Sequence, residues 1–216
     1  THTQARYALP QVVKRFIERY PKVRLSMHQG NPVQIAEWTL KGEADIAIAT
    51  EALDQYPQLV MLPCYQWGHS VVAPDGHPIL SASNITLAEL ARWPLITYDP
   101  AFAGRSRINK AFERAQLAPN IVLAAIDADV IKTYVSLGLG LGIIASMAYD
   151  PVRDQGLQAR DVSQFFGLNT TRIGLRRGTY LRRFEYDFIE LFASHLSKRA
   201  VDMAMEGSGL NDEYQL

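Results

Sequence analysis

Residues 45–50 read Asp-Ile-Ala-Ile-Ala-Thr, and this short apolar run decides the fold class. Such a run is typical of a β-strand that helices cover on both faces of its sheet. Before it, the chain predicts a helix over residues 9–20, a strand over 23–29 and a second helix over 31–42. An alternation of strands and helices indicates a parallel α/β sheet.

Apolar spacing and terminal residues support these elements. From Leu9 to residue 20 the apolar positions follow the 3, 1, 3, 1, 3 spacing of one helical face, and Pro21 ends the helix. The second helix has Asn31 as its N-cap, Pro32 at its first position and Gly42 at its end. Alternation predicts the strand between the helices, which comprises Val23, Leu25, Met27 and Gln29 and ends at Gly30.

A second parallel α/β unit follows a proline-rich stretch that spans residues 56–80. Helices are predicted at 87–93, 105–117 and 129–137, and strands at 95–98, 121–126 and 141–145. A strand at 171–176 and one long amphipathic helix close the chain, and the polar tail beyond residue 205 is expected to fray. We expect two lobes, residues 1–66 with 169–216 and residues 67–168, with a ligand cleft between them.

Composition argues against several classes of protein. The 216 residues carry 22 basic and 22 acidic side chains, so nothing supplies the basic face that DNA binding needs. The single Cys64 excludes an internal disulfide and fits a reducing compartment. No stretch reaches the roughly 18 to 20 apolar residues of a membrane span, and the start lacks signal-peptide features. We therefore expect a cytoplasmic protein, with an upstream segment removed because no methionine begins the chain.

Polar residues at helix and strand ends are the candidates for binding. Residues 1–4, Thr-His-Thr-Gln, precede the first helix, where unpaired N–H groups and the helix dipole favour an anion. Thr3 could instead simply cap that helix. Thr50 ends a buried strand, where its hydroxyl could bond a ligand or the local backbone. Residues 104–106, Gly-Arg-Ser, form a second candidate anion site or an ordinary loop with a solvated arginine.

No pattern indicates catalysis, a metal site or a cofactor. The glycines at 138, 140 and 142 follow a helix and precede a strand, which is the reverse of a dinucleotide-binding turn, so we interpret them as a helix C-cap and a tight turn. Of Asp127 and Asp129, one is expected to cap the next helix. The five histidines lack metal-ligand spacing, and no serine lies in a Gly-x-Ser-x-Gly elbow. We expect neither an enzyme nor a cofactor.

Five motifs together resemble one family. They are Thr-His-Thr-Gln-Ala-Arg-Tyr at 1–7, Gln-Gly at 29–30, Ala-Asp-Ile-Ala-Ile-Ala-Thr-Glu at 44–51, Gly-Arg-Ser at 104–106 and Asp-Ala-Asp-Val-Ile-Lys-Thr-Tyr-Val at 127–135. In this order, and over nearly the whole chain, they resemble the effector-binding domain of LysR-type transcriptional regulators of the CysB/Cbl subfamily. The resemblance implies a two-lobed, type II periplasmic-binding-protein-like fold.

The resemblance also implies a site. The residues it assigns to ligand binding are Thr1, Thr3, Gln4, Gln29, Thr50, Trp67, Ala103 and Gly104. The family pattern has a threonine where this sequence has Ala103, so one hydroxyl of the second lobe is missing. The alternative role for Trp67 is packing between lobes.

The implied function is regulation of sulfur assimilation, either of cysteine biosynthesis or of alkanesulfonate and sulfate-starvation genes. The implied effector is a small anion such as sulfate, adenylyl sulfate, O-acetylserine or N-acetylserine. The implied parent is a homo-oligomer, with paired domains in a tetramer, that binds DNA only through an N-terminal winged helix-turn-helix outside these residues. The main alternative is a periplasmic-type receptor for sulfate or an amino acid in transport, and an enzyme is the third.

Overall fold

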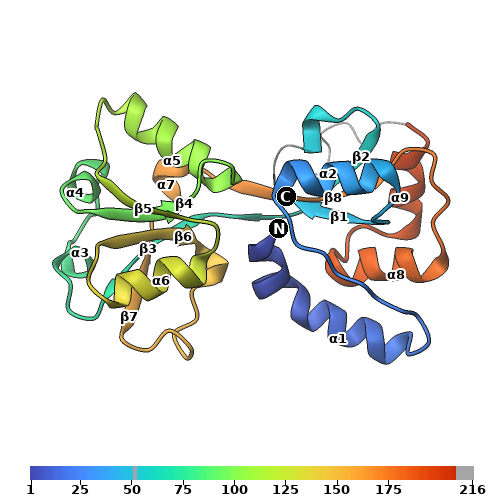
Figure 1. Cartoon of the computed structure of the whole chain (residues 1–216), viewed down its shortest axis with the longest axis horizontal. Coiled ribbons are helices and arrows are strands. Elements are labelled where there is room, and N and C mark those ends of the chain that lie inside the picture. The colour runs from blue at the N-terminus through green and yellow to red at the C-terminus, as the bar shows by residue number, and fades with distance from the viewer. Residues whose placement is uncertain (51–52, 208–216) are drawn as a thin grey trace. The chain divides into compact units, whose positions relative to one another are not determined.

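The chain folds into two compact units. The computed structural model describes residues 1–50 and 53–207, without the side chains of Asp54 and Ala103. Unit 1 comprises Thr1–Gln66 and the part of the chain from Thr170 onward, and unit 2 comprises Trp67–Asn169 (Figure 1). The chain thus passes from unit 1 to unit 2 once and returns once.

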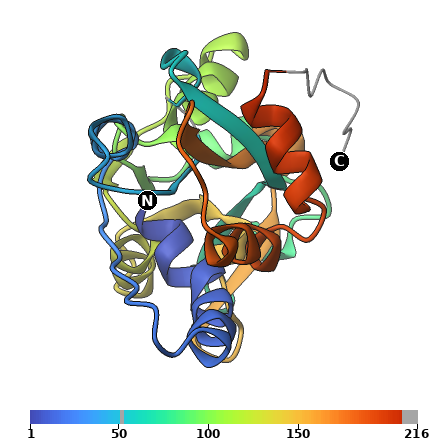
Figure 2. The ribbon, with the colours of Figure 1, turned by 90° about the vertical axis from the view of Figure 1, so that its right-hand side faces the viewer.

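Unit 1 is built on a three-stranded sheet in the order β1-β8-β2. The strands are β1 (Ala47–Ala49), β2 (Leu59–Trp67) and β8 (Asn169–Arg176), and β1 pairs antiparallel with β8. Its helical elements are η1 (Gln4–Ala8), α1 (Leu9–Arg19), α2 (Pro32–Lys41), η2 (Leu53–Gln55), α8 (Arg183–Phe192) and α9 (Lys198–Met205). Helices α1 and α8 lie side by side (Figure 2).

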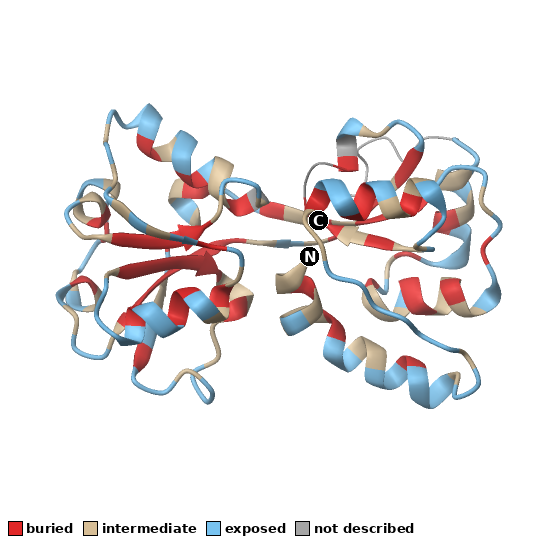
Figure 3. Ribbon diagram, viewed as in Figure 1, coloured by how far each residue is buried: buried red, intermediate tan, exposed pale blue. Residues whose placement is uncertain are grey.

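Unit 1 buries most of the apolar faces predicted from sequence, although Ile17 of α1 is 48% exposed. Phe16 of α1 meets Phe188 of α8 edge to face, with ring centroids 5.3 Å apart. Ile35 of α2 is buried in a separate cluster with the alanines of β1. In Figure 3, buried positions on these helices alternate with exposed ones, as expected of amphipathic helices that cover a sheet.

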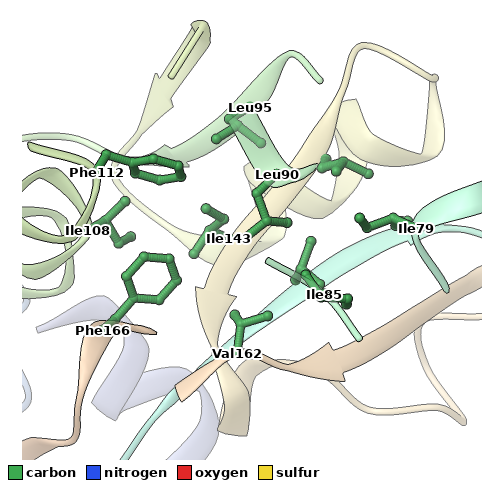
Figure 4. Close-up of a cluster of buried hydrophobic side chains, with 12 residues drawn as sticks. Ile79, Ile85, Leu90, Leu95, Ile108, Phe112, Ile143, Val162 and Phe166 are labelled. Atoms are coloured by element: carbon green, nitrogen blue, oxygen red, sulfur yellow. The ribbon is translucent and has the colours of Figure 1, made fainter. Parts of the chain in front are cut away.

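Unit 2 contains a five-stranded mixed sheet in the order β5-β4-β6-β3-β7. Strands β5, β4 and β6 run parallel, whereas β3 is antiparallel to both β6 and β7. The strands are β3 (His69–Pro74), β4 (Leu95–Tyr98), β5 (Ile121–Ala125), β6 (Leu141–Ala145) and β7 (Leu157–Asp161). The helical elements are α3 (Pro78–Ser81), α4 (Leu87–Ala91), α5 (Ala103–Arg114), α6 (Ala128–Ser136), η3 (Ser146–Ala148) and α7 (Ser163–Phe166). Figure 4 shows its core, where Phe112 and Phe166 pack with Ile143 and Leu90.

Local capping signals are confirmed. Asn31 and Gln34 form a reciprocal capping box at the start of α2, and Gly42 ends that helix in a left-handed conformation. Asp127 caps α6 by accepting a hydrogen bond from the amide of Val130 at 2.9 Å. Asp129 is not a cap, since it pairs with Lys132 at 3.3 Å.

The glycines of residues 138–142 have structural roles. Gly138 adopts a positive φ of 78° after α6, and its N–H donates to the carbonyl of Val135, as a helix C-cap does. At Gly140 a Cβ would come within 2.4 Å of the carbonyl oxygen of Pro94. The interpretation of these glycines as a cap and a tight turn is confirmed, and the turn also needs close approach of the chain to Pro94.

Three expectations about the elements were wrong. Residues 23–29 form no strand, because they have no partner edge in the described part of the chain. Neither sheet is parallel throughout, because β8 pairs antiparallel with β1 in unit 1 and β3 pairs antiparallel with β6 and β7 in unit 2. The single C-terminal helix is two helices, α8 and α9, since Ser197 caps a new helix by accepting from the amide of Ala200. The predicted frayed tail falls largely on residues outside those the structure describes.

A buried histidine lies in unit 2. His69 is fully buried between Trp67 and Phe166, each with its ring centroid 5.4 Å away. Neither ring nitrogen has a hydrogen-bond partner within the described chain. Burial, with a smaller contribution from the Arg107 charge, lowers the pKa of His69 to about 4. The imidazole is therefore neutral at pH 7.

This histidine predicts a loss of stability in acid. Because the folded state disfavours protonation, the unfolded state gains protons first as the pH falls below 6.5. The expected loss between pH 7 and pH 4 is about 3 kcal/mol, the equivalent of the lowered pKa. The difference between wild type and His69→Phe in denaturant unfolding at the two pH values measures it. Replacement of the exposed His28 by Phe is the control, and an unchanged pH dependence in His69→Phe would contradict the assignment.

Candidate functional site

The helix that begins unit 1 opens with an unusual turn. Residues Gln4–Ala8 are π-helical, and the amide of Leu9 donates to the carbonyl of Gln4 five residues earlier. Single π-turns inside α-helices are frequent at functional sites. Thr3 occupies the cap position, yet its side chain makes no capping hydrogen bond. The alternative that Thr3 simply caps the helix is therefore wrong, and its hydroxyl is not committed to the helix end.

Gln4 is buried and bonded on both sides of its amide. Its Nε2 donates to Thr171 Oγ1 at 3.0 Å, and the hydroxyl of Tyr65 donates to its Oε1. Burial is the main reason that the pKa of Tyr65 rises to about 12, so this hydroxyl keeps its proton. Gln4 thus ties the start of the helix to β2 and β8. These contacts leave one N–H and one lone pair of the amide for any other partner.

Thr50 follows β1 and is buried, with 6% of its surface exposed. Its carbonyl accepts a hydrogen bond from Arg172 Nη1 at 3.3 Å. Arg172 is half-buried in β8 beside Ala49, and it forms no ion pair with a carboxylate in the described part of the chain. A positive charge therefore lies next to Thr50. The prediction of site residues from sequence missed Arg172, and its only signal was a basic residue inside a predicted strand.

The remaining unit 1 candidates divide into two groups. The nitrogen of Thr1 donates to the carbonyl of Ile48 at 3.1 Å, which attaches the start of the chain to β1. The structure thus brings Thr1 and Gln4 into contact with the β1–β8 pair that also leads to Thr50. Gln29 is exposed, and it makes no hydrogen bond to another described residue. Nothing in the geometry joins Gln29 to the others.

The unit 2 candidates gather at the start of α5. A Cβ added to Gly104 would lie 2.8 Å from His69 Nε2 and 3.7 Å from the Trp67 ring, so these three residues are close neighbours. Ala103 begins α5, but its side chain lies outside what the structure describes. The cap position is Phe102, which offers no side-chain hydrogen bond to the first turn.

Arg105 is hydrogen bonded to residues of unit 2. Its Nη1 donates to the carbonyl of Tyr98 at 2.7 Å, and its Nε donates to Asn109 Oδ1 at 2.7 Å. The alternative of a solvated arginine is wrong, because these two hydrogen bonds hold the guanidinium, whereas the anion site at residues 104–106 stays a prediction. An anion at this helix start would meet backbone N–H groups before this side chain.

Other chemistry is sparse among the residues that the structure describes. No group of three or more histidine, cysteine, aspartate or glutamate side chains there is arranged to hold a metal ion. Cys64 is buried in unit 1, and burial raises the pKa of its thiol to about 12. No helix in residues 1–50 and 53–207 is long and apolar enough to span a membrane.

Comparison with known proteins gives a consistent result. The family model "LysR substrate binding domain" matches residues 1–197. The transcriptional regulators SsuR and CysB of Burkholderia cenocepacia are 56% and 51% identical to the chain, over 93% and 100% of its length. The chain spans 65% and 68% of those two proteins, about two thirds of each.

A solved structure agrees with these relatives. The crystal structure of the cofactor-binding domain of the Cbl transcriptional regulator superposes with a TM-score of 0.90 at 46% identity. The match covers 95% of this chain and 90% of that one. These relatives are transcriptional regulators and not enzymes, as expected. The chain belongs to the LysR substrate-binding domain family, and its fold is the two-lobed, type II periplasmic-binding-like fold of LysR effector domains.

Proposed function

We propose that this chain senses a small anionic effector for a LysR-type regulator of sulfur assimilation genes. The observation that carries the proposal is the donor set of unit 1, where an uncommitted Thr3 hydroxyl, Thr50 and Arg172 accompany the start of a helix. Relatives named SsuR, CysB and Cbl support regulation related to sulfur. A transport receptor is not favoured, because the relatives are transcriptional regulators.

The donor set fits an anion for electrostatic reasons. A helix start carries partial positive charge from its unpaired N–H groups, and hydroxyls add neutral donors that need no counter-charge. Arg172 contributes a positive charge that no described carboxylate offsets, since its printed partner is the carbonyl of Thr50. Sulfate, adenylyl sulfate, O-acetylserine and N-acetylserine each present an anionic group to such donors.

Ala103 affects which of these anions we favour. The hydroxyl that the family resemblance implies at this position is absent, while Trp67 and the backbone of the α5 start remain. A compact sulfate loses one donor there. An acetylated serine loses less, because its acetyl group presents apolar surface that needs no hydrogen-bond donor.

Effector binding alone does not regulate transcription. The effector must bind two arrangements of the protein with different affinity if it is to shift the balance between them. We propose that DNA is bound by an N-terminal winged helix-turn-helix outside these residues, in a cytoplasmic homo-oligomer. The zero net charge of this chain is consistent with leaving DNA contacts to another domain.

An exposed apolar stripe supports the homo-oligomer. Val130 and Tyr134 of α6 lie at helical spacing with Ile126 before the helix and Leu137 after it, and all four are exposed. Leu137 is 74% exposed. Contiguous apolar surface of this kind marks protein interfaces. We propose that a second copy of the domain covers this stripe in the paired arrangement of a tetrameric parent.

The ligand site predicts the effect of two substitutions. Thr3→Ala and Thr50→Ala are each expected to weaken anion binding by about tenfold or more, because a hydrogen bond to a charged group contributes about 1.5–3 kcal/mol. Isothermal titration with sulfate, thiosulfate, adenylyl sulfate, O-acetylserine and N-acetylserine measures the affinities. Thr133→Ala is the control, since this exposed threonine bonds only within α6 of unit 2. Equal affinities in all variants would show that the site is misplaced.

The apolar stripe predicts a change in assembly. Leu137→Asp places a charge on the proposed interface and is expected to raise the dissociation constant of the oligomer by about tenfold or more. Sedimentation velocity over a range of protein concentrations measures this change. Tyr180→Asp, at an exposed residue of unit 1, is the control. If Leu137→Asp assembles like the wild type and the control, the stripe is not the interface.

A further inference from the structure

His69 is a fully buried histidine beside the candidate residues of unit 2. Its side chain is 0% exposed, and neither Nδ1 nor Nε2 has a hydrogen-bond partner among the residues that the structure describes. A buried polar group without a partner costs folding free energy, and a phenylalanine here would avoid that cost while keeping an aromatic ring in place. Stability alone therefore does not account for a histidine at this position.

The sheet of unit 2 fixes the position of this side chain. His69 begins β3 opposite Ala145 of β6, and its carbonyl accepts a hydrogen bond from the amide of Val162 at 2.9 Å. Its ring lies edge to face with the rings of Trp67 and Phe166, at interplanar angles of 61° and 79°. Phe166 belongs to the core of unit 2 (Figure 4). Backbone pairing and two aromatic contacts thus hold the imidazole in one place.

The Nε2 atom of His69 faces the first turn of α5. A Cβ on Gly104 would lie 2.8 Å from Nε2, so the close approach requires glycine. Because Cα–Cβ bonds tilt toward the start of a helix, Nε2 lies on the side of the turn toward which the unpaired N–H groups point. One of these groups, the amide of Arg105, donates to the carbonyl of Phe102 at 3.0 Å. The side chain of Phe102 caps none of the others.

The imidazole meets this helix start in its neutral form. Burial, with a smaller contribution from the Arg107 charge, lowers the pKa of His69 to about 4. A neutral imidazole carries one N–H and one lone pair on its ring nitrogens. With the N–H on Nε2, the ring adds a donor to the N–H groups of the helix start. A group that only accepts hydrogen bonds, such as sulfate or a carboxylate, satisfies all of these donors.

We infer that His69 is a further ligand-binding residue of unit 2, which donates from Nε2 to an anionic group of the effector at the first turn of α5. The assignment rests on the proposed function, because it names a side chain that holds the proposed effector. Nε2 has almost no surface open to solvent, so the anionic group reaches it only when the first turn of α5 shifts. Gly104 suits such a shift, because a glycine backbone is conformationally permissive. His69 then supplies a donor beside Ala103, which has no hydroxyl.

Matched substitutions test this role by isothermal titration with sulfate and with N-acetylserine. His69→Phe removes both nitrogens but keeps a ring against Trp67 and Phe166, and we expect it to weaken binding by about tenfold or more. His69→Gln keeps an N–H donor near the position of Nε2, and we expect an affinity within about threefold of wild type. His77→Phe is the control, because His77 also packs on an indole ring of unit 2, that of Trp93, and we expect it to bind like wild type. Equal affinities of wild type and His69→Phe for both anions would overturn the inference.

The two anions distinguish the source of the bound group. A loss of affinity for both supports a subsite that takes either sulfate or a carboxylate. A loss for sulfate alone, or for N-acetylserine alone, supports a subsite for that group only.

A measurement on the unaltered chain does not depend on whether a variant folds. NMR of the histidine ring nitrogens separates a protonated nitrogen from an unprotonated one. When the chain is saturated with sulfate or N-acetylserine, we expect the signals of His69 to move and its proton to lie on Nε2. The signals of His77 are expected to stay where they are. Signals of His69 that remain unchanged at saturation with both anions would contradict the inference.

The threonine variants separate this inference from the proposed function. If Thr3→Ala and Thr50→Ala weaken anion binding and His69→Phe does not, the site of unit 1 stands and the role of His69 is wrong. If His69→Phe weakens binding and the threonine variants do not, the role of His69 stands and the site of unit 1 is wrong. If neither anion binds to the wild type, both proposals are wrong.

Discussion

The side-chain amide of Gln4 is the contact on which the candidate site depends. It joins the first turn of the chain to Tyr65 of β2 and Thr171 of β8 inside a buried environment. Loss of such a buried amide leaves its partners unsatisfied, which costs about 1–3 kcal/mol for each group. The neighbouring Thr3 hydroxyl and the helix start are therefore held against the sheet by a residue whose own amide is mostly occupied. Gln4 positions the donors more than it adds to them.

Much of the fold could be predicted from sequence because its signals are local. The cap at Asn31, the C-cap at Gly138 and the strand β4 follow from short-range backbone chemistry and apolar spacing. The antiparallel pairing of β1 with β8 could not be predicted, since it joins residues more than 120 positions apart. The division of the C-terminal helix into α8 and α9 could not be predicted, because apolar residues continue on both sides of Ser197.

The candidate site shows the same division. Helix-start and strand-end signals gave Thr3, Thr50 and Gly104 as candidates, and the resemblance to a family added Trp67. Arg172 and His69 were missed because their importance depends on neighbours that are distant in sequence. Gln29 was assigned on resemblance alone, and no contact within the described chain joins it to the other candidates. Burial and pairing state, which decide whether a polar side chain is available to a guest, are tertiary properties.

The burial of Cys64 bears on how this domain could respond to sulfur, either by chemistry at a thiol or by binding a small molecule. Oxidation, alkylation and disulfide exchange all require the thiolate form, and a thiol with a pKa of about 12 in an apolar core supplies almost none at neutral pH. This domain has no second cysteine to act as a resolving partner. Redox chemistry at Cys64 is therefore disfavoured, and the effector that we propose is instead a dissociable molecule.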